Sequence, residues 1–204
     1  MNKINQMLIF SVLFSTLFLC SLVSRGQTIF LIPTQEDCLR VINGIGPFVC
    51  GWGYGGVMND TSRSIEPVED RTVFDFDISN LSTISISNAT LTFFIQNQQN
   101  GVTTSTVDVF IFYGESVVQT NDWNEGTYYQ NFLDTYGMHS LNFTAAVKNA
   151  IADGQHFLDV KLLTVTDMSP CLVIDPPWQS IRLNLIINPP LIIPPSNLRV
   201  IMNP

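Results

Sequence analysis

Apolar and polar residues alternate along much of the chain beyond residue 70. Phe74, Phe76 and Ile78 share one face of an extended segment, and Asp75 and Asp77 lie on the opposite face. This period of two predicts a strand that buries one face. The same alternation returns after polar, turn-forming stretches at Leu91, Phe93, Ile95, Val107, Val109, Ile111 and Tyr113.

Four more segments have the composition of strands, since they are short and rich in Val, Ile, Leu, Phe and Thr. They are residues 28–32, 157–166, 171–174 and 181–187. Strands of this length separated by polar turns are typical of an antiparallel β-sandwich, in which each strand buries one face. The sequence therefore predicts an all-β fold.

One segment interrupts this pattern with a helical spacing. Thr144 is a suitable N-cap residue, Val147 and Ile151 lie four residues apart, and Gly154 stands where a helix would end. We therefore expect one short helix at about residues 144–153, covering an end of the sandwich. The last segment, residues 188–204, is apolar but broken by paired prolines, which cannot donate a backbone N–H to a central strand.

The chain begins as a secretory signal peptide does. Lys3 precedes a nearly uncharged apolar run, and the small residues Ser24 and Gly26 stand three and one positions before a cut at Gln27. A membrane anchor is the alternative, for which this run is near the lower length limit. We predict that residues 1–26 are removed. Cleavage would leave one β-sandwich domain at residues 27–187 and the tail, in a secreted or cell-surface protein with no transmembrane anchor.

The charge of the chain bears on its partners. The formal net charge of the 204 residues is −8, and loss of residues 1–26 makes it more negative, because that segment holds Lys3 and Arg25 but no acid. The remaining basic residues are scattered and form no basic stripe, so the surface would repel a phosphate backbone. The sequence therefore predicts no nucleic-acid partner.

Three cysteines remain after cleavage, Cys38, Cys50 and Cys171, in a compartment that permits disulfides. Their spacings match no zinc motif, so a structural disulfide outranks a metal site. The turn-forming residues 43–47 favour a Cys38–Cys50 bond, because they would fold these two cysteines back on each other. Pairing of Cys171 with either of the others is the alternative.

Three short motifs follow one another in residues 71–79 (RTVFDFDIS), 86–91 (ISNATL) and 141–144 (LNFT). Together they resemble the DNRLRE-type, carbohydrate-binding-module-like jelly-roll domains of secreted microbial proteins, over about residues 65–165. Asn142-Phe143-Thr144 departs from the acidic form that the family has at the helix entry. The resemblance implies a jelly-roll order of strands and a non-catalytic surface or matrix module associated with polysaccharides.

Residues 51–56 (GWGYGG) match the G-x-G-x-x-G spacing of a dinucleotide-binding turn. Such a turn needs a following helix whose N-terminus receives the pyrophosphate. The residues that follow have no helical pattern, so we reject a nucleotide site. The glycines predict a tight turn instead, and Trp52 and Tyr54 either pack beneath it or present an aromatic surface to a sugar.

A second segment, residues 122–129, is rich in aromatic and acidic residues and is predicted to be a loop. Trp123 and Tyr128 would add ring faces to those of Trp52 and Tyr54 if both loops lie at the same end of the sandwich. The polar groups that would orient sugar hydroxyls are Asp122, Asn124 and Glu125. These three also offer oxygen ligands that suit calcium, although their spacing is not that of an EF-hand loop, and no other cofactor is indicated.

These features predict a non-catalytic module whose partner is a polysaccharide or cell-surface glycan. Two alternatives stay open. One is a structural or assembly subunit that uses the apolar tail. The other is a polysaccharide-active enzyme, which would need two carboxylates at a set spatial separation that sequence cannot supply.

Overall fold

The computed structural model describes residues 27–50, 56–60, 67–98, 106–164, 169–174 and 181–188. The predicted signal peptide, Trp52 and Tyr54 of the glycine stretch, and the tail beyond residue 188 lie outside the described residues. The strands in chain order are β1 Gln27–Leu31, β2 Gln35–Ile42, β3 Ile45–Val49, β4 Gly56–Asp60, β5 Val68–Asp77, β6 Ile86–Gln98, β7 Thr106–Phe112, β8 Thr127–Leu133, β9 Gly137–Asn142, β10 Phe157–Thr164, β11 Ser169–Ile174 and β12 Arg182–Ile187. The helical elements are the 3-10 turns η1 (Ser79–Leu81) and η2 (Thr120–Trp123) and the helix α2 (Thr144–Ala152).

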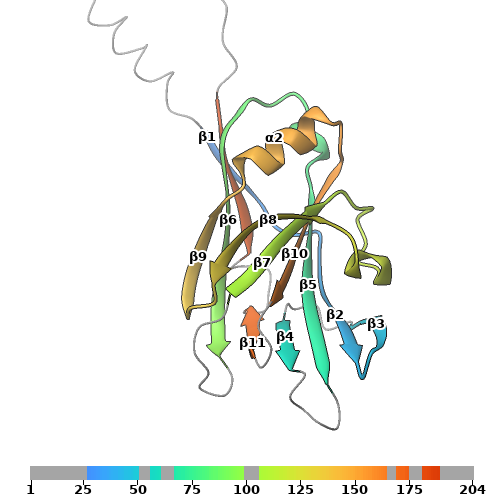
Figure 1. Cartoon of the computed structure of the whole chain (residues 1–204). Helices are drawn as coiled ribbons and strands as arrows, with labels where there is room; N and C mark the ends of the chain where they lie inside the picture. The colour runs from blue at the N-terminus through green and yellow to red at the C-terminus, as the bar shows by residue number, and fades with distance from the viewer. Residues whose placement is uncertain are drawn as a thin grey trace, which may run out of the picture.

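Eight strands pair in a nested order. β7 pairs with β8, β6 with β9, β5 with β10, and β1 with β12, and all four pairs are antiparallel. Pairing of β6 with β12 and of β7 with β10 then joins them into two layers, β1-β12-β6-β9 and β5-β10-β7-β8 (Figure 1). This is the strand order of a jelly roll. The predicted fold class, an antiparallel jelly-roll sandwich with one short helix, is confirmed.

Four further strands extend this framework. β2 lies along the free edge of β5, and β3 folds back on β2 as a hairpin. β4 and β11 pair with each other between β5 and β6, so they join the two layers at the end opposite α2 (Figure 1). Hydrophobic alternation does not predict β2, because its sequence QEDCLRVI mixes charged and apolar residues on both faces.

The core fills the space between the two layers. Phe74 and Phe76 of β5 are fully buried, as are Phe93 of β6 and Val160 of β10. Burial of each such side chain stabilises the fold by about 1.5–3 kcal/mol. The inward face predicted for β5 from its alternation is therefore confirmed.

Helix α2 forms where the sequence predicts a helix, but its start differs from the expectation. Thr144 is the first residue of the helix and not its N-cap, and Phe143 occupies the cap position without a side-chain hydrogen bond to the helix. The Asn142 side chain accepts the Thr144 backbone N–H at 2.9 Å instead. The Thr144 hydroxyl accepts the backbone N–H of Ala89 in β6 at 3.0 Å, so it fastens the helix to the sheet.

Candidate functional site

The chain between β7 and β8, residues 113–126, folds back over the outer face of the β5-β10-β7-β8 layer. Trp123 and Val118 of this covering segment pack with Val73 of β5 and Leu39 of β2 in a second, smaller buried cluster. Val73 lies on the face of β5 opposite the main core, because successive strand residues point to opposite faces. The covering segment therefore seals the central part of this outer face.

Trp123 is part of this seal. Its side chain is 9% exposed, and the Arg71 guanidinium carbon lies 3.8 Å from the centre of its ring. Arg71 also donates a hydrogen bond from Nη1 to the Trp123 backbone carbonyl. The prediction that Trp123 presents an open ring face at an end of the sandwich is wrong, because apolar groups and a guanidinium on the sheet cover the ring.

A buried lysine holds the covering segment in place. Lys161 of β10 donates hydrogen bonds from Nζ to the backbone carbonyls of Asp122 (2.8 Å), Trp123 (2.9 Å) and Glu125. Burial, and next the nearby Arg71 charge, lower the Lys161 pKa to about 8. Because the Lys161 ammonium binds three backbone carbonyls of the covering segment, it fixes the turn around η2.

The Asp122 side chain forms a hydrogen bond within the covering segment. Its carboxylate accepts the backbone N–H of Gln119 at 2.7 Å, which completes a capping box at η2. The side chain is buried, and this burial raises its pKa. Asp122 therefore orders the segment, which departs from its predicted role in orienting a sugar.

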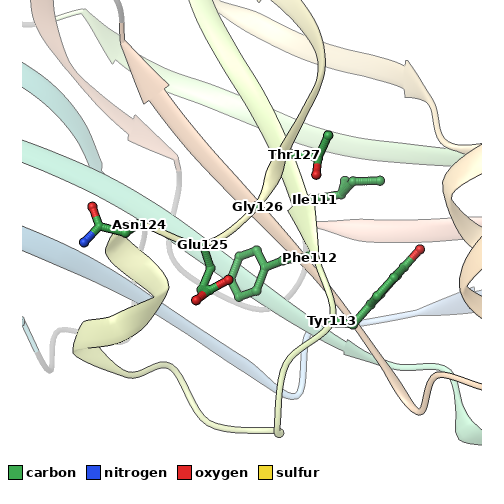
Figure 2. Close-up of a pocket in the computed structure, with 7 residues that line it drawn as sticks. All are labelled: Ile111, Phe112, Tyr113, Asn124, Glu125, Gly126 and Thr127. Atoms are coloured by element: carbon green, nitrogen blue, oxygen red, sulfur yellow. The ribbon is translucent and has the colours of Figure 1, made fainter.

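An open cleft of about 660 Å³ lies where β7 ends and β8 begins. Figure 2 shows its lining from both strand ends, with Asn124 and Tyr113 at opposite ends of the row. The lining residues are Ile111, Phe112, Tyr113, Asn124, Glu125, Gly126 and Thr127. Two residues predicted for ligand binding, Asn124 and Glu125, thus line the same cleft.

Tyr113 supplies an aromatic side chain to this cleft and is 40% exposed. The sequence does not indicate Tyr113 as a site residue, because it ends an alternating strand, and that pattern predicts only which face is buried. Tyr128 is the second residue of β8 and not part of a loop, and it is 51% exposed beside Phe110, with ring centres 5.9 Å apart. Gly126 allows the turn into β8, because its φ of 105° favours glycine.

Two buried carboxylates lie next to each other beneath the covering segment. Asp75 of β5 and Asp159 of β10 are register partners on the outer face. Burial raises the pKa of Asp75, and burial with the adjacent Asp75 charge raises the pKa of Asp159 to about 8. They are far apart in sequence and were not predicted as a pair.

The predicted cysteine pair is close in space. Cys38 of β2 and Cys50 lie at the end of the β2–β3 hairpin, and the Cys50 backbone N–H donates to the Cys38 carbonyl at 2.8 Å. Both cysteines are free thiols, with no disulfide between them. A hydrogen bond between the two thiols raises the pKa of Cys38 and lowers the pKa of Cys50. The side chain of Cys171 lies outside the described residues, and the disulfide stays a prediction.

The same two sulfurs and one oxygen of Asp70 lie within 4.8 Å of one another, a spacing that could hold a metal ion. Both Asp70 oxygens, however, accept hydrogen bonds from Arg40 at 2.6 Å. A guanidinium held on the carboxylate opposes a second positive charge there. This arrangement favours a disulfide over a metal.

The two loops predicted to share a site are only partly described. β3, which precedes the glycine stretch, lies against η2 of the covering segment. Residues 51–55 themselves lie outside the described residues, so a shared surface with Trp52 and Tyr54 stays a prediction.

The sequence was compared with protein-family models and with curated proteins. No protein-family model matches the chain, and no significant match is found among curated proteins. Across the ranges that the structure describes, no helix has the length and apolar character needed to cross a membrane.

Proposed function

We propose that this chain is a secreted, non-catalytic β-sandwich module that binds a glycan in the cleft between the end of β7 and the start of β8. The observation that carries the proposal is the lining of that cleft. Tyr113 offers an apolar ring face, and the polar residues Asn124 and Glu125 line the same cleft. A few polar groups beside aromatic surface is the usual composition of a small-ligand site.

The position of the unusual carboxylates also supports a binding role over a catalytic one. Asp75 and Asp159 are nearly fully buried beneath the covering segment, at 1% and 4% exposed. A general acid or base must come within hydrogen-bonding reach of the group it serves. No substrate reaches these two carboxylates while the covering segment is in place.

The test is a glycan-array screen followed by affinity measurements on the best ligand. Tyr113→Ala should weaken binding roughly thirtyfold, since loss of a central aromatic contact typically costs about 2 kcal/mol. Glu125→Gln should also weaken it, while its backbone carbonyl remains available to Lys161. The matched control is Tyr136→Ala, because Tyr136 is 70% exposed and does not line the cleft.

Equal affinity of all three variants, or no glycan bound by the wild type, would refute the proposal.

A structural or assembly subunit is the second candidate function. Leu133, Tyr136 and Met138, at the turn between strands β8 and β9, are all more than half exposed. Self-association in light scattering that Met138→Lys abolishes would support that alternative.

A further inference from the structure

The carboxylate of Asp75 is buried and accepts no hydrogen bond from the described residues. The residue is 1% exposed, and neither carboxylate oxygen has a hydrogen-bond donor. The nearby Thr34 hydroxyl donates to the backbone carbonyl of Asp75 at 3.1 Å, not to the carboxylate. A buried carboxylate without a donor or a counter-charge costs several kcal/mol, so its environment calls for a positive charge.

The neighbours of Asp75 in the sheet supply more oxygen atoms. Gln35 of β2 and Asp159 of β10 are both register partners of Asp75, one on each side. Side chains that are directly opposite in an antiparallel pair lie on the same face, about 4.5–5.5 Å apart at Cβ. The three side chains therefore form one row of amide and carboxylate oxygens across the outer face.

The covering segment closes this row. The Gln35 amide oxygen accepts the backbone N–H of Val118 at 3.2 Å. Asp159 points at the backbone of Gly114, where an added Cβ would lie 1.8 Å from its Oδ2. Backbone at residues 114–118 thus covers Asp75 and Asp159, whereas Gln35 lies at the exposed end of the row. No side chain fits at position 114.

The basic side chains near this row are engaged elsewhere. Lys161 directs Nζ to three carbonyls of the covering segment, and Arg71 binds Glu69 at 2.7 Å and the Trp123 carbonyl. Among the described residues, no basic side chain forms an ion pair with Asp75 or Asp159. The charge of these carboxylates is therefore balanced either by a bound cation or by protonation of the carboxyl groups.

We propose that Asp75 and Asp159, with the side-chain oxygen of Gln35, bind a divalent cation, calcium, beneath the covering segment. Calcium accepts six to eight oxygen ligands in flexible geometry, including bidentate carboxylates and amide oxygens. The row offers oxygens alone, whereas zinc in structural sites prefers thiolate and imidazole. This site differs from the calcium ligands expected from sequence, Asp122, Asn124 and Glu125, and it does not depend on glycan binding.

The experiment begins with wild-type protein freed of metal by a chelator and dialysed. Calcium chloride, magnesium chloride and manganese chloride are then titrated separately, by calorimetry and by thermal melting. We expect one calcium bound per chain, with a rise in melting temperature that magnesium does not match. The absence of any cation-dependent heat or melting shift at millimolar concentration would overturn the proposal and favour a proton shared by the two carboxyl groups.

Variants locate the site. Asp75→Asn and Asp159→Asn should each weaken calcium binding by roughly tenfold or more, since a charged ligand is lost. Neither should melt below the metal-free wild type, because each removes a buried charge. Asp77→Asn is the matched control: Asp77 lies two residues along the same face of β5, and its carboxylate accepts the Ser79 N–H at 2.9 Å. Calcium binding that survives in both site variants, or is lost in the control, would contradict the assignment.

Discussion

Trp123 lies under Arg71 in the smaller buried cluster, so it contributes to stability and not to a ligand surface. We predict that Trp123→Ala lowers the free energy of unfolding by about 3–5 kcal/mol, the usual cost of deleting a buried aromatic side chain. Tyr128→Ala should change it by less than about 1 kcal/mol, because Tyr128 is half exposed. Urea denaturation measures both. A small effect of Trp123→Ala would restore the ring as a candidate ligand platform.

Single residues also show what sequence reasoning can reach. The alternation placed Phe74 and Phe76 inward and Asp75 outward correctly, because strand geometry is local. It could not show that a distant segment covers the outward face and buries Trp123 there. Asn124 was identified as a polar loop residue, but the cleft it lines depends on how β7 and β8 pair, which is a long-range feature.

The Thr144 hydroxyl at the start of helix α2 makes side-chain hydrogen bonds to β6. The Thr144 hydroxyl accepts the N–H of Ala89 and donates to an oxygen of Asn88 at 3.0 Å. We predict that Thr144→Val destabilises the protein by about 1–3 kcal/mol, because it leaves a buried backbone donor unsatisfied. Thr144→Ser keeps the hydroxyl and should remain near wild type. Chemical denaturation of the three proteins checks this, and equal losses in both variants would point to packing of the methyl group instead.

The β2–β3 hairpin brings Cys38 and Cys50 to the same end. In oxidised protein we predict a bond between them, found by peptide mapping without reduction. Reduction, or Cys38→Ser with Cys50→Ser, should lower stability by about 2–4 kcal/mol, the typical contribution of a disulfide. A cross-link from Cys171 to either cysteine would show that the pairing inferred from the turn at residues 43–47 is wrong.

The nesting of strand pairs could not be derived from the sequence pattern. Alternation identifies strands one at a time, whereas β1 pairs with β12 across most of the chain, and β5 pairs with the distant β10. Several strand orders satisfy the same pattern of buried faces, so only the resemblance to jelly-roll domains pointed to this one. Such long-range pairing is also associated with slow folding, in milliseconds to seconds.

The pairing of the first strand with the last makes β1 the edge strand of the β1-β12-β6-β9 layer. β1 begins at Gln27, the residue at which we predict signal-peptide cleavage, and its Ile29 and Leu31 pack against the main core. We predict that a chain lacking residues 27–31 melts at a lower temperature and self-associates, because loss of Ile29 and Leu31 exposes apolar side chains of the main core. Size-exclusion chromatography with light scattering, together with thermal melting, tests this. Thr28→Ala, an exposed change within β1, should stay monomeric and near wild type. A monomeric truncated chain with an unchanged melting temperature would show that β1 adds nothing to the stability of the core.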